Sequence, residues 1–205
     1  MKTTILAAVA AVGFASAASA DDFDNTLLTT TVTTGNLEFS VSSGVDRNLE
    51  GLGDDWVAGA KATVLSYGLG EGTSDVKLYG QFGEVAEDEF GVLGAQYVWT
   101  TVDEGSTLEL TADAAYVMFD DFENGDLVLT PSAELTAALD NQIAVFGGVG
   151  YSWDATNDFA QLGGYVEAGA DIALTDTVSV RPSVVQPFDT ANDDAYAAIE
   201  LKLNF

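Results

Sequence analysis

Apolar and polar residues alternate along most of this chain, and the clearest case is its last segment, residues 195–205. Every second position from Ala195 to Phe205 is apolar, whereas the positions between them include Glu200, Lys202 and Asn204. Successive side chains of a β-strand point to opposite faces of its sheet. The pattern therefore predicts a strand with one apolar face and one polar face.

The same alternation recurs along the chain, in runs separated by clusters of Gly, Asp, Asn and Thr. It predicts ten strands, at residues 37–45, 56–67, 76–83, 90–102, 107–118, 127–139, 143–153, 159–174, 178–186 and 195–205. The Thr-rich segment 25–34 does not follow the pattern, so we expect it to be a lead-in or an extension of the first strand.

Both an antiparallel sandwich and a closed antiparallel barrel would alternate in this way. Three observations favour the barrel. Charged residues inside the predicted strands lie almost wholly on one parity, and the connections alternate between short and long. Aromatic residues also gather near strand ends on the apolar parity: Trp56, Trp99, Tyr116, Tyr151 and Trp153. We therefore expect an all-β, up-and-down transmembrane barrel of about ten strands, with eight or twelve also compatible. A soluble exported sandwich is the alternative.

The composition narrows the possible functions. The chain has 33 acidic and 6 basic residues, a formal net charge of −27, and this excludes binding to nucleic acid through the phosphate backbone. Apolar residues make up 47% of the chain, enough for it to fold. It has neither His nor Cys, which removes Ser-His-Asp and Cys-His nucleophiles and His-containing zinc sites. We therefore expect no enzymatic activity.

The first twenty residues have the pattern of an export signal. Lys2 precedes an apolar stretch over residues 5–18, and the segment ends in the small residues Ala18, Ser19 and Ala20. This predicts a secretory signal peptide, residues 1–20, cleaved after Ala20. Residues 21–205 would then form a single barrel domain.

The alternating strands and the closing strand that ends in Phe205 resemble small bacterial outer-membrane β-barrel proteins of the OmpA-barrel, OmpX and opacity type. The resemblance implies a location in the outer membrane, in contact with its lipid and lipopolysaccharide. It also implies that the barrel-assembly machinery recognises the segment ending in Phe205. The resemblance assigns no functional residue of the family to a position in this sequence, and it does not indicate the oligomeric state.

The polar parity of the strands would line the lumen. It carries seven acidic and four basic residues: Glu38, Lys61, Lys77, Glu109, Asp113, Glu134, Glu167, Asp171, Arg181, Glu200 and Lys202. Such charges can form a structural network of ion pairs that fills a narrow barrel. They can also line a water-filled conduit. We expect a non-enzymatic barrel with a structural or surface-contact role. The alternative is a narrow porin that passes small cations or neutral solutes.

The long connections are rich in acidic residues. The densest group, Asp120, Asp121, Glu123 and Asp126, is a weak candidate for Ca²⁺, which prefers oxygen ligands. The alternative is a solvated, negatively charged rim that binds no ion and keeps the protein from associating. No other cofactor is expected.

Overall fold

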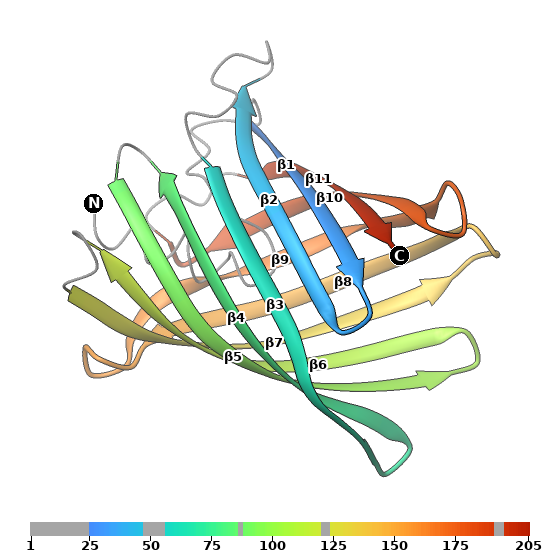
Figure 1. Cartoon of the computed structure of the whole chain (residues 1–205), viewed down its shortest axis with the longest axis horizontal. Coiled ribbons are helices and arrows are strands. Elements are labelled where there is room, and N and C mark those ends of the chain that lie inside the picture. Colours follow the sequence, from blue (N-terminus) through green and yellow to red (C-terminus); the bar gives the residue numbers. More distant parts are fainter. Residues whose placement is uncertain (1–24, 47–55, 86–87, 120–123, 191–194) are drawn as a thin grey trace.

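The computed structural model describes residues 25–46, 56–85, 88–119, 124–190 and 195–205, and these form a closed β-barrel (Figure 1). Its eleven strands are β1 (Asn25–Thr34), β2 (Leu37–Asp46), β3 (Trp56–Leu69), β4 (Gly72–Val85), β5 (Asp88–Asp103), β6 (Ser106–Phe119), β7 (Asn124–Ala138), β8 (Ile143–Asp154), β9 (Ala160–Ala173), β10 (Val178–Phe188) and β11 (Tyr196–Asn204). The described part of the chain contains no helix long and apolar enough to cross a membrane.

Each strand pairs with its neighbours in sequence, and the sheet closes where β1 meets β11. All pairs are antiparallel except β1–β11, which is parallel. The predicted all-β barrel is confirmed, and its pairing is antiparallel as predicted except at the β1–β11 seam. The ten predicted strands match β2 to β11 within a few residues at each end.

Strand β1 is the one strand that was not predicted, and it is formed by the segment that the sequence pattern leaves unassigned. Residues 25–34 form neither a lead-in nor an extension of the next strand, because they pair along their whole length with β2. Six of the ten residues are Thr, which suits either face of a strand, so the segment shows little alternation. The described chain therefore starts and stops at opposite ends of the barrel.

The two ends of the barrel differ in their connections. At one end, here called the turn end, the strands are joined at residues 35–36, 70–71, 104–105, 139–142 and 174–177. At the other, here called the loop end, the connections are residues 47–55, 86–87, 120–123, 155–159 and 189–195. The predicted alternation of short and generally longer connections is therefore confirmed. The predicted signal peptide lies outside the described residues.

The outer face of the barrel is apolar over its middle. Large apolar side chains there are 40–61% exposed, among them Phe39, Leu78, Leu93, Leu135 and Val145. Aromatic residues flank this band near the loop end, where the Trp56 and Phe82 rings meet edge to face at 5.3 Å and Tyr151 lies 4.8 Å from Trp153. A closed barrel with an apolar outside must have its polar residues inside.

One residue faces the opposite way from the sequence prediction. The alternation predicted over residues 159–174 assigns Leu162 to the outer face. In the structure Leu162 lies just inside β9, is 6% exposed and belongs to the inner apolar cluster. The register between β8 and β9 shifts at Ser152 and Trp153, and Gly163 has a φ of +112°. This bulge changes the parity of the strand, because one extra residue reverses the side to which its neighbours point.

Two ladders are interrupted at prolines. The β7–β8 pairing skips Pro131 and the β9–β10 pairing skips Pro182, since proline cannot donate a backbone hydrogen bond. Inner side chains cross both gaps: Thr130 Oγ1 lies 2.8 Å from Ser152 Oγ, and Arg181 Nη1 lies 3.1 Å from Asp171 Oδ2.

Candidate functional site in the barrel lumen

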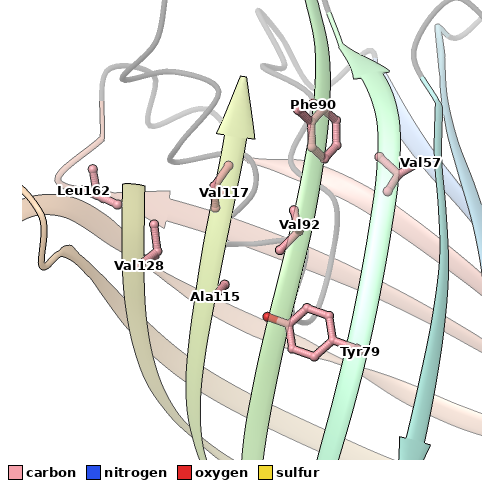
Figure 2. Packing of buried hydrophobic residues seen from close by; sticks show 8 residues of the cluster. All are labelled: Val57, Tyr79, Phe90, Val92, Ala115, Val117, Val128 and Leu162. Carbon is pink, nitrogen blue, oxygen red and sulfur yellow. The ribbon is translucent and has the colours of Figure 1, made fainter. Parts of the chain in front are cut away.

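Eight buried apolar side chains form a cluster on the inner face of the wall toward the loop end, here called the apolar plug (Figure 2). Its members come from β3 to β7 and β9: Val57, Tyr79, Phe90, Val92, Ala115, Val117, Val128 and Leu162. They are 0–8% exposed, and Val117 is completely buried. An eleven-stranded barrel is wider than the eight-stranded barrels whose interior side chains just fill it. Here buried apolar side chains from six strands cluster on the inner face of this half.

A second apolar group lies beside the seam where β1 meets β11. It comprises Leu27, Tyr165, Val185, Tyr196 and Ala198, here called the seam cluster. Leu27 is 5% exposed, and Val185 is 1% exposed. Leu27 therefore connects β1 to apolar side chains of β9, β10 and β11 near the loop end.

Buried polar side chains lie at the base of the apolar plug. Asp113 is 7% exposed, and its carboxylate accepts hydrogen bonds from the Tyr79 hydroxyl and from the Gln96 amide, each at 2.9 Å. One strand further on, Thr130 bonds to Ser152. These hydrogen bonds replace the bonds to water that the buried polar atoms lose. The polar side chains at the boundary between the two halves are therefore paired.

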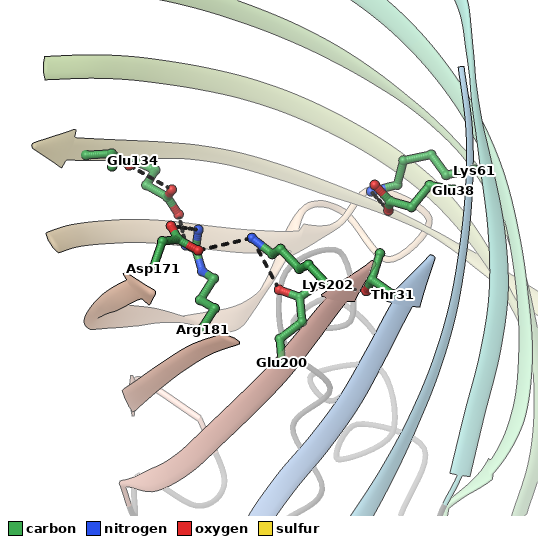
Figure 3. Close-up of polar contacts among 9 residues, drawn as sticks. Thr31, Glu38, Lys61, Glu134, Asp171, Arg181, Glu200 and Lys202 are labelled. Carbon is green, nitrogen blue, oxygen red and sulfur yellow. Dashed lines mark hydrogen bonds and ion pairs between the residues drawn. The ribbon is translucent and has the colours of Figure 1, made fainter. Parts of the chain in front are cut away.

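The half of the lumen at the turn end contains a network of ion pairs around Arg181, here called the lumen network (Figure 3). The guanidinium contacts Glu134 at 2.5 Å and Asp171 at 3.1 Å. Lys202 extends the network, since its ammonium lies 3.4 Å from Asp171 and 3.5 Å from Glu200. The Arg181 guanidinium also lies 3.4 Å from the centre of the Phe146 ring, a cation–π contact.

This arrangement is determined by the strands. Arg181 pairs with Glu200 across β10 and β11, which puts both side chains on the inner face. Asp171 lies beside Arg181 at the proline gap of β9–β10, and Glu134 reaches in from β7. Thr31 on β1 donates to the Glu200 carboxylate at 2.6 Å and so joins the network to the seam.

The other charged lumen residues are less tightly held. The Lys61 ammonium is 3.6 Å from the Glu38 carboxylate. Glu109 pairs directly with Glu134 across β6 and β7, and Lys77 lies on β4; within the described residues neither Glu109 nor Lys77 forms an ion pair.

A cavity of about 350 Å³ lies between these groups. Nine of the eleven charged residues assigned to the lumen from the sequence line it: Glu38, Lys61, Lys77, Glu109, Glu134, Glu167, Arg181, Glu200 and Lys202. The other two, Asp113 and Asp171, bond to lumen side chains. Strand β1 contributes Leu27, Thr29, Thr31 and Thr33 to the wall.

The structure offers little for a resident metal ion. Among the described residues no three acidic side chains are grouped so that they could hold one. Three residues of the calcium candidate, Asp120, Asp121 and Glu123, lie outside the described residues. The fourth, Asp126, accepts a hydrogen bond from Asn157 at 3.4 Å. The lumen therefore offers ion pairing and space for water or a small polar solute.

Comparison with known proteins gives a partial likeness of fold. The structure is similar to that of an anion-selective porin from Comamonas acidovorans, with a TM-score of 0.41 and 10% sequence identity. The likeness covers 82% of this chain and 52% of that chain, so this chain spans about half the length of the porin. No family model matches the chain, and no curated protein matches its sequence. The barrel assignment rests on the strand order and register.

Proposed function

We propose that this chain is a non-enzymatic, integral β-barrel of the bacterial outer membrane, closed to solutes at its loop end, with a structural or surface-contact role. The observation that carries the proposal is a closed barrel with an apolar outer face and a charged inner face. A closed barrel leaves no strand edge unpaired, which is a requirement for strands in hydrocarbon. Soluble monomers rarely expose apolar surface on this scale.

The height of the apolar band supports the membrane location. Trp56 and Tyr67 lie near opposite ends of β3, eleven residues apart. With a rise of ~3.3 Å per residue and a tilt of ~40°, this separation is about 28 Å along the barrel axis. Outer-membrane barrels have an apolar band of roughly 25 Å between two aromatic girdles.

The three tryptophans provide a direct test of this location. Trp56, Trp99 and Trp153 are all the tryptophans in the chain, and the strand register puts them on the outer face near strand ends. Protein refolded into vesicles should lose fluorescence to lipids brominated near the headgroup more than to lipids brominated near the chain ends. Protein that stayed in solution would show no quenching by either lipid, and that result would reject the membrane proposal.

The apolar plug favours a barrel that does not conduct. Phe90 and Val117 are 1% and 0% exposed, so water is excluded around them. The polar cavity favours the second candidate, a narrow porin for small cations or neutral solutes, since its lining is charged and its volume exceeds that of several water molecules.

Single-channel recording separates these two candidates. Residues 21–205 refolded into a planar bilayer should give no reproducible steps, with a heat-dependent gel shift as the folding control. Reproducible cation-selective steps from protein with the shifted band would establish the porin instead. Lys77→Gln and Glu109→Gln would then be the first variants to examine for changed selectivity.

A further inference from the structure

The seam of the barrel has an unusual geometry. Strand β1 runs parallel to β11 over eight paired positions, from Thr26 opposite Ala197 to Thr33 opposite Asn204, and antiparallel to β2. Strand β2 is therefore antiparallel to β11. If β1 were absent, β2 and β11 would have the correct relative direction to pair with each other.

Strand β1 has a more polar outer face than its neighbour β2. Its outer face carries Thr26, Thr30 and Thr34 beside Leu28 and Val32. The outer face of β2 instead carries Leu37, Phe39 and Val41, which are 42%, 48% and 56% exposed. Parallel pairing is slightly less stable per residue than antiparallel pairing. A Thr-rich outer face and a parallel seam both make β1 easier to release than a strand with an apolar outer face and two antiparallel neighbours would be.

Among the described residues, β1 makes two side-chain hydrogen bonds and one contact to an apolar cluster. Thr31 donates to Glu200 at 2.6 Å, Thr29 lies 2.9 Å from Ser42, and Leu27 packs into the seam cluster. Only the contact to Glu200 joins β1 to the lumen network. Water could take the place of the two hydroxyl contacts if β1 left the wall, whereas the Leu27 side chain would then need another apolar environment.

The cavity depends on β1. Four β1 side chains form part of its wall, together with residues of β2 and β11 on either side. The diameter of a barrel grows with its number of strands. A wall of ten strands would therefore be narrower, and the space beside β1 would close.

We propose that β1 is a removable strand and that the barrel has a second closed state of ten antiparallel strands, β2 to β11, in which β2 pairs with β11 and the cavity is lost. In this second state every pair in the wall is antiparallel and the strand number is even, as is usual for bacterial barrels. The proposal goes beyond the proposed function and does not depend on whether the lumen conducts.

Pairs of introduced cysteines test this proposal, because the chain contains no native Cys. Thr30 pairs with both Leu201 and Val41, so Val41 and Leu201 lie two strands apart on the outer face. Strands are spaced by about 4.8 Å, which puts these two Cα atoms beyond the ~7 Å limit for a disulfide. A Val41→Cys/Leu201→Cys disulfide can form only when β2 has replaced β1.

Two matched pairs serve as controls. Thr30→Cys/Leu201→Cys joins neighbouring strands and reports the eleven-stranded state. Ala95→Cys/Leu129→Cys lies across two strand spacings on either side of Ala114, in a part of the wall that should not change. Each protein is refolded into lipid vesicles, oxidised mildly and analysed by mass spectrometry and by gel mobility.

The proposal predicts that the 30/201 and 41/201 pairs both close within one molecule. The 41/201 pair should close at least about ten-fold faster than the 95/129 pair, as a minor state of a few per cent allows. Equal rates for 41/201 and 95/129 would overturn the proposal. So would failure of the 30/201 pair in a folded barrel, because β1 would then not occupy the seam. Disulfide-linked dimers of the 30/201 variant would overturn it in favour of strand exchange between copies.

Discussion

The two halves of the lumen are built on the same strands but keep their inner space closed in different ways. At the loop end, Phe90, Val117 and their neighbours exclude water by packing. At the turn end, Arg181 and Lys202 bind carboxylates around a cavity. The difference shows that a barrel of intermediate width need not have a uniform interior. One half provides tight packing, and the other tolerates charge and space.

The largest expected effect comes from placing a charge in the apolar plug. Val117→Asp would bury a carboxylate within the apolar plug, so we expect the free energy of unfolding to fall by about 4 kcal/mol or more. Urea unfolding in lipid vesicles, followed by the heat-dependent gel shift, measures this change. Ser40→Asp is the matched control, because Ser40 lines the polar cavity and its strand neighbour Thr31 pairs with Lys202. Equal losses in the two variants would remove the distinction between the halves.

Next in size is the effect of removing bulk from the plug. Phe90→Ala should cost about 3 to 4 kcal/mol, because Phe90 is 1% exposed and the space it leaves cannot fully close. If the plug is what closes the lumen, the variant should also show small conductance steps that the parent protein lacks. Leu93→Ala, on the outer face of the same strand, should leave conductance unchanged. Steps in both variants would point to general disorder of the barrel.

In the polar half the largest loss is expected at Arg181. Arg181→Met keeps an unbranched side chain at this position but removes the guanidinium from the Phe146 ring, and it leaves Glu134 and Asp171 without their shared cation. Removing one partner of a largely buried ion pair leaves uncompensated charge, and we expect a loss of about 3 kcal/mol. Adding Glu134→Gln should recover part of it. No recovery in the double variant would mean that the loss comes from packing rather than from charge.

The smallest effect is expected at the edge of the cavity. The Lys61–Glu38 pair is 3.6 Å long, with side chains 22% and 37% exposed. Lys61→Met should therefore change the free energy of unfolding by less than about 1 kcal/mol, and 1 M salt should remove most of the difference. A larger loss that salt does not affect would place Lys61 in a drier setting, comparable with that of Arg181.

The sequence predicts the wall of this molecule well because a strand repeats its side-chain direction every two residues. Ten of the eleven strands follow from alternation, and the charged residues assigned to the lumen all lie on inner positions or bond to inner side chains. What alternation cannot predict is which inner residues meet, since this depends on the register of strands far apart in sequence. Arg181 and Glu134 lie 47 residues apart.

The missed features have identifiable causes. Strand β1 is missed because Thr occupies both of its faces. The plug is missed because the inner face of β5 changes along the strand: Phe90 and Val92 point to the same side as Gln96. The start of β5 is therefore apolar on both faces and shows no alternation. That two-sided apolar run is itself a signal, because a strand that is buried on both faces has continuous apolar sequence. Leu162 is predicted on the wrong face because the bulge beside it reverses the parity of the strand, and alternation alone does not locate a bulge. The bulge includes Gly163, whose positive φ favours glycine.

The two proline gaps make the wall mechanically uneven. The β8–β9 hairpin has an interrupted ladder on either side, at Pro131 and at Pro182, and at each gap a side-chain bond on the inner face takes the place of backbone bonds. Side chains rotate more easily than backbone ladders shear, so in the proposed membrane location lateral pressure from the lipid should flatten the barrel along these two lines first. The hairpin between them would then move as one rigid panel.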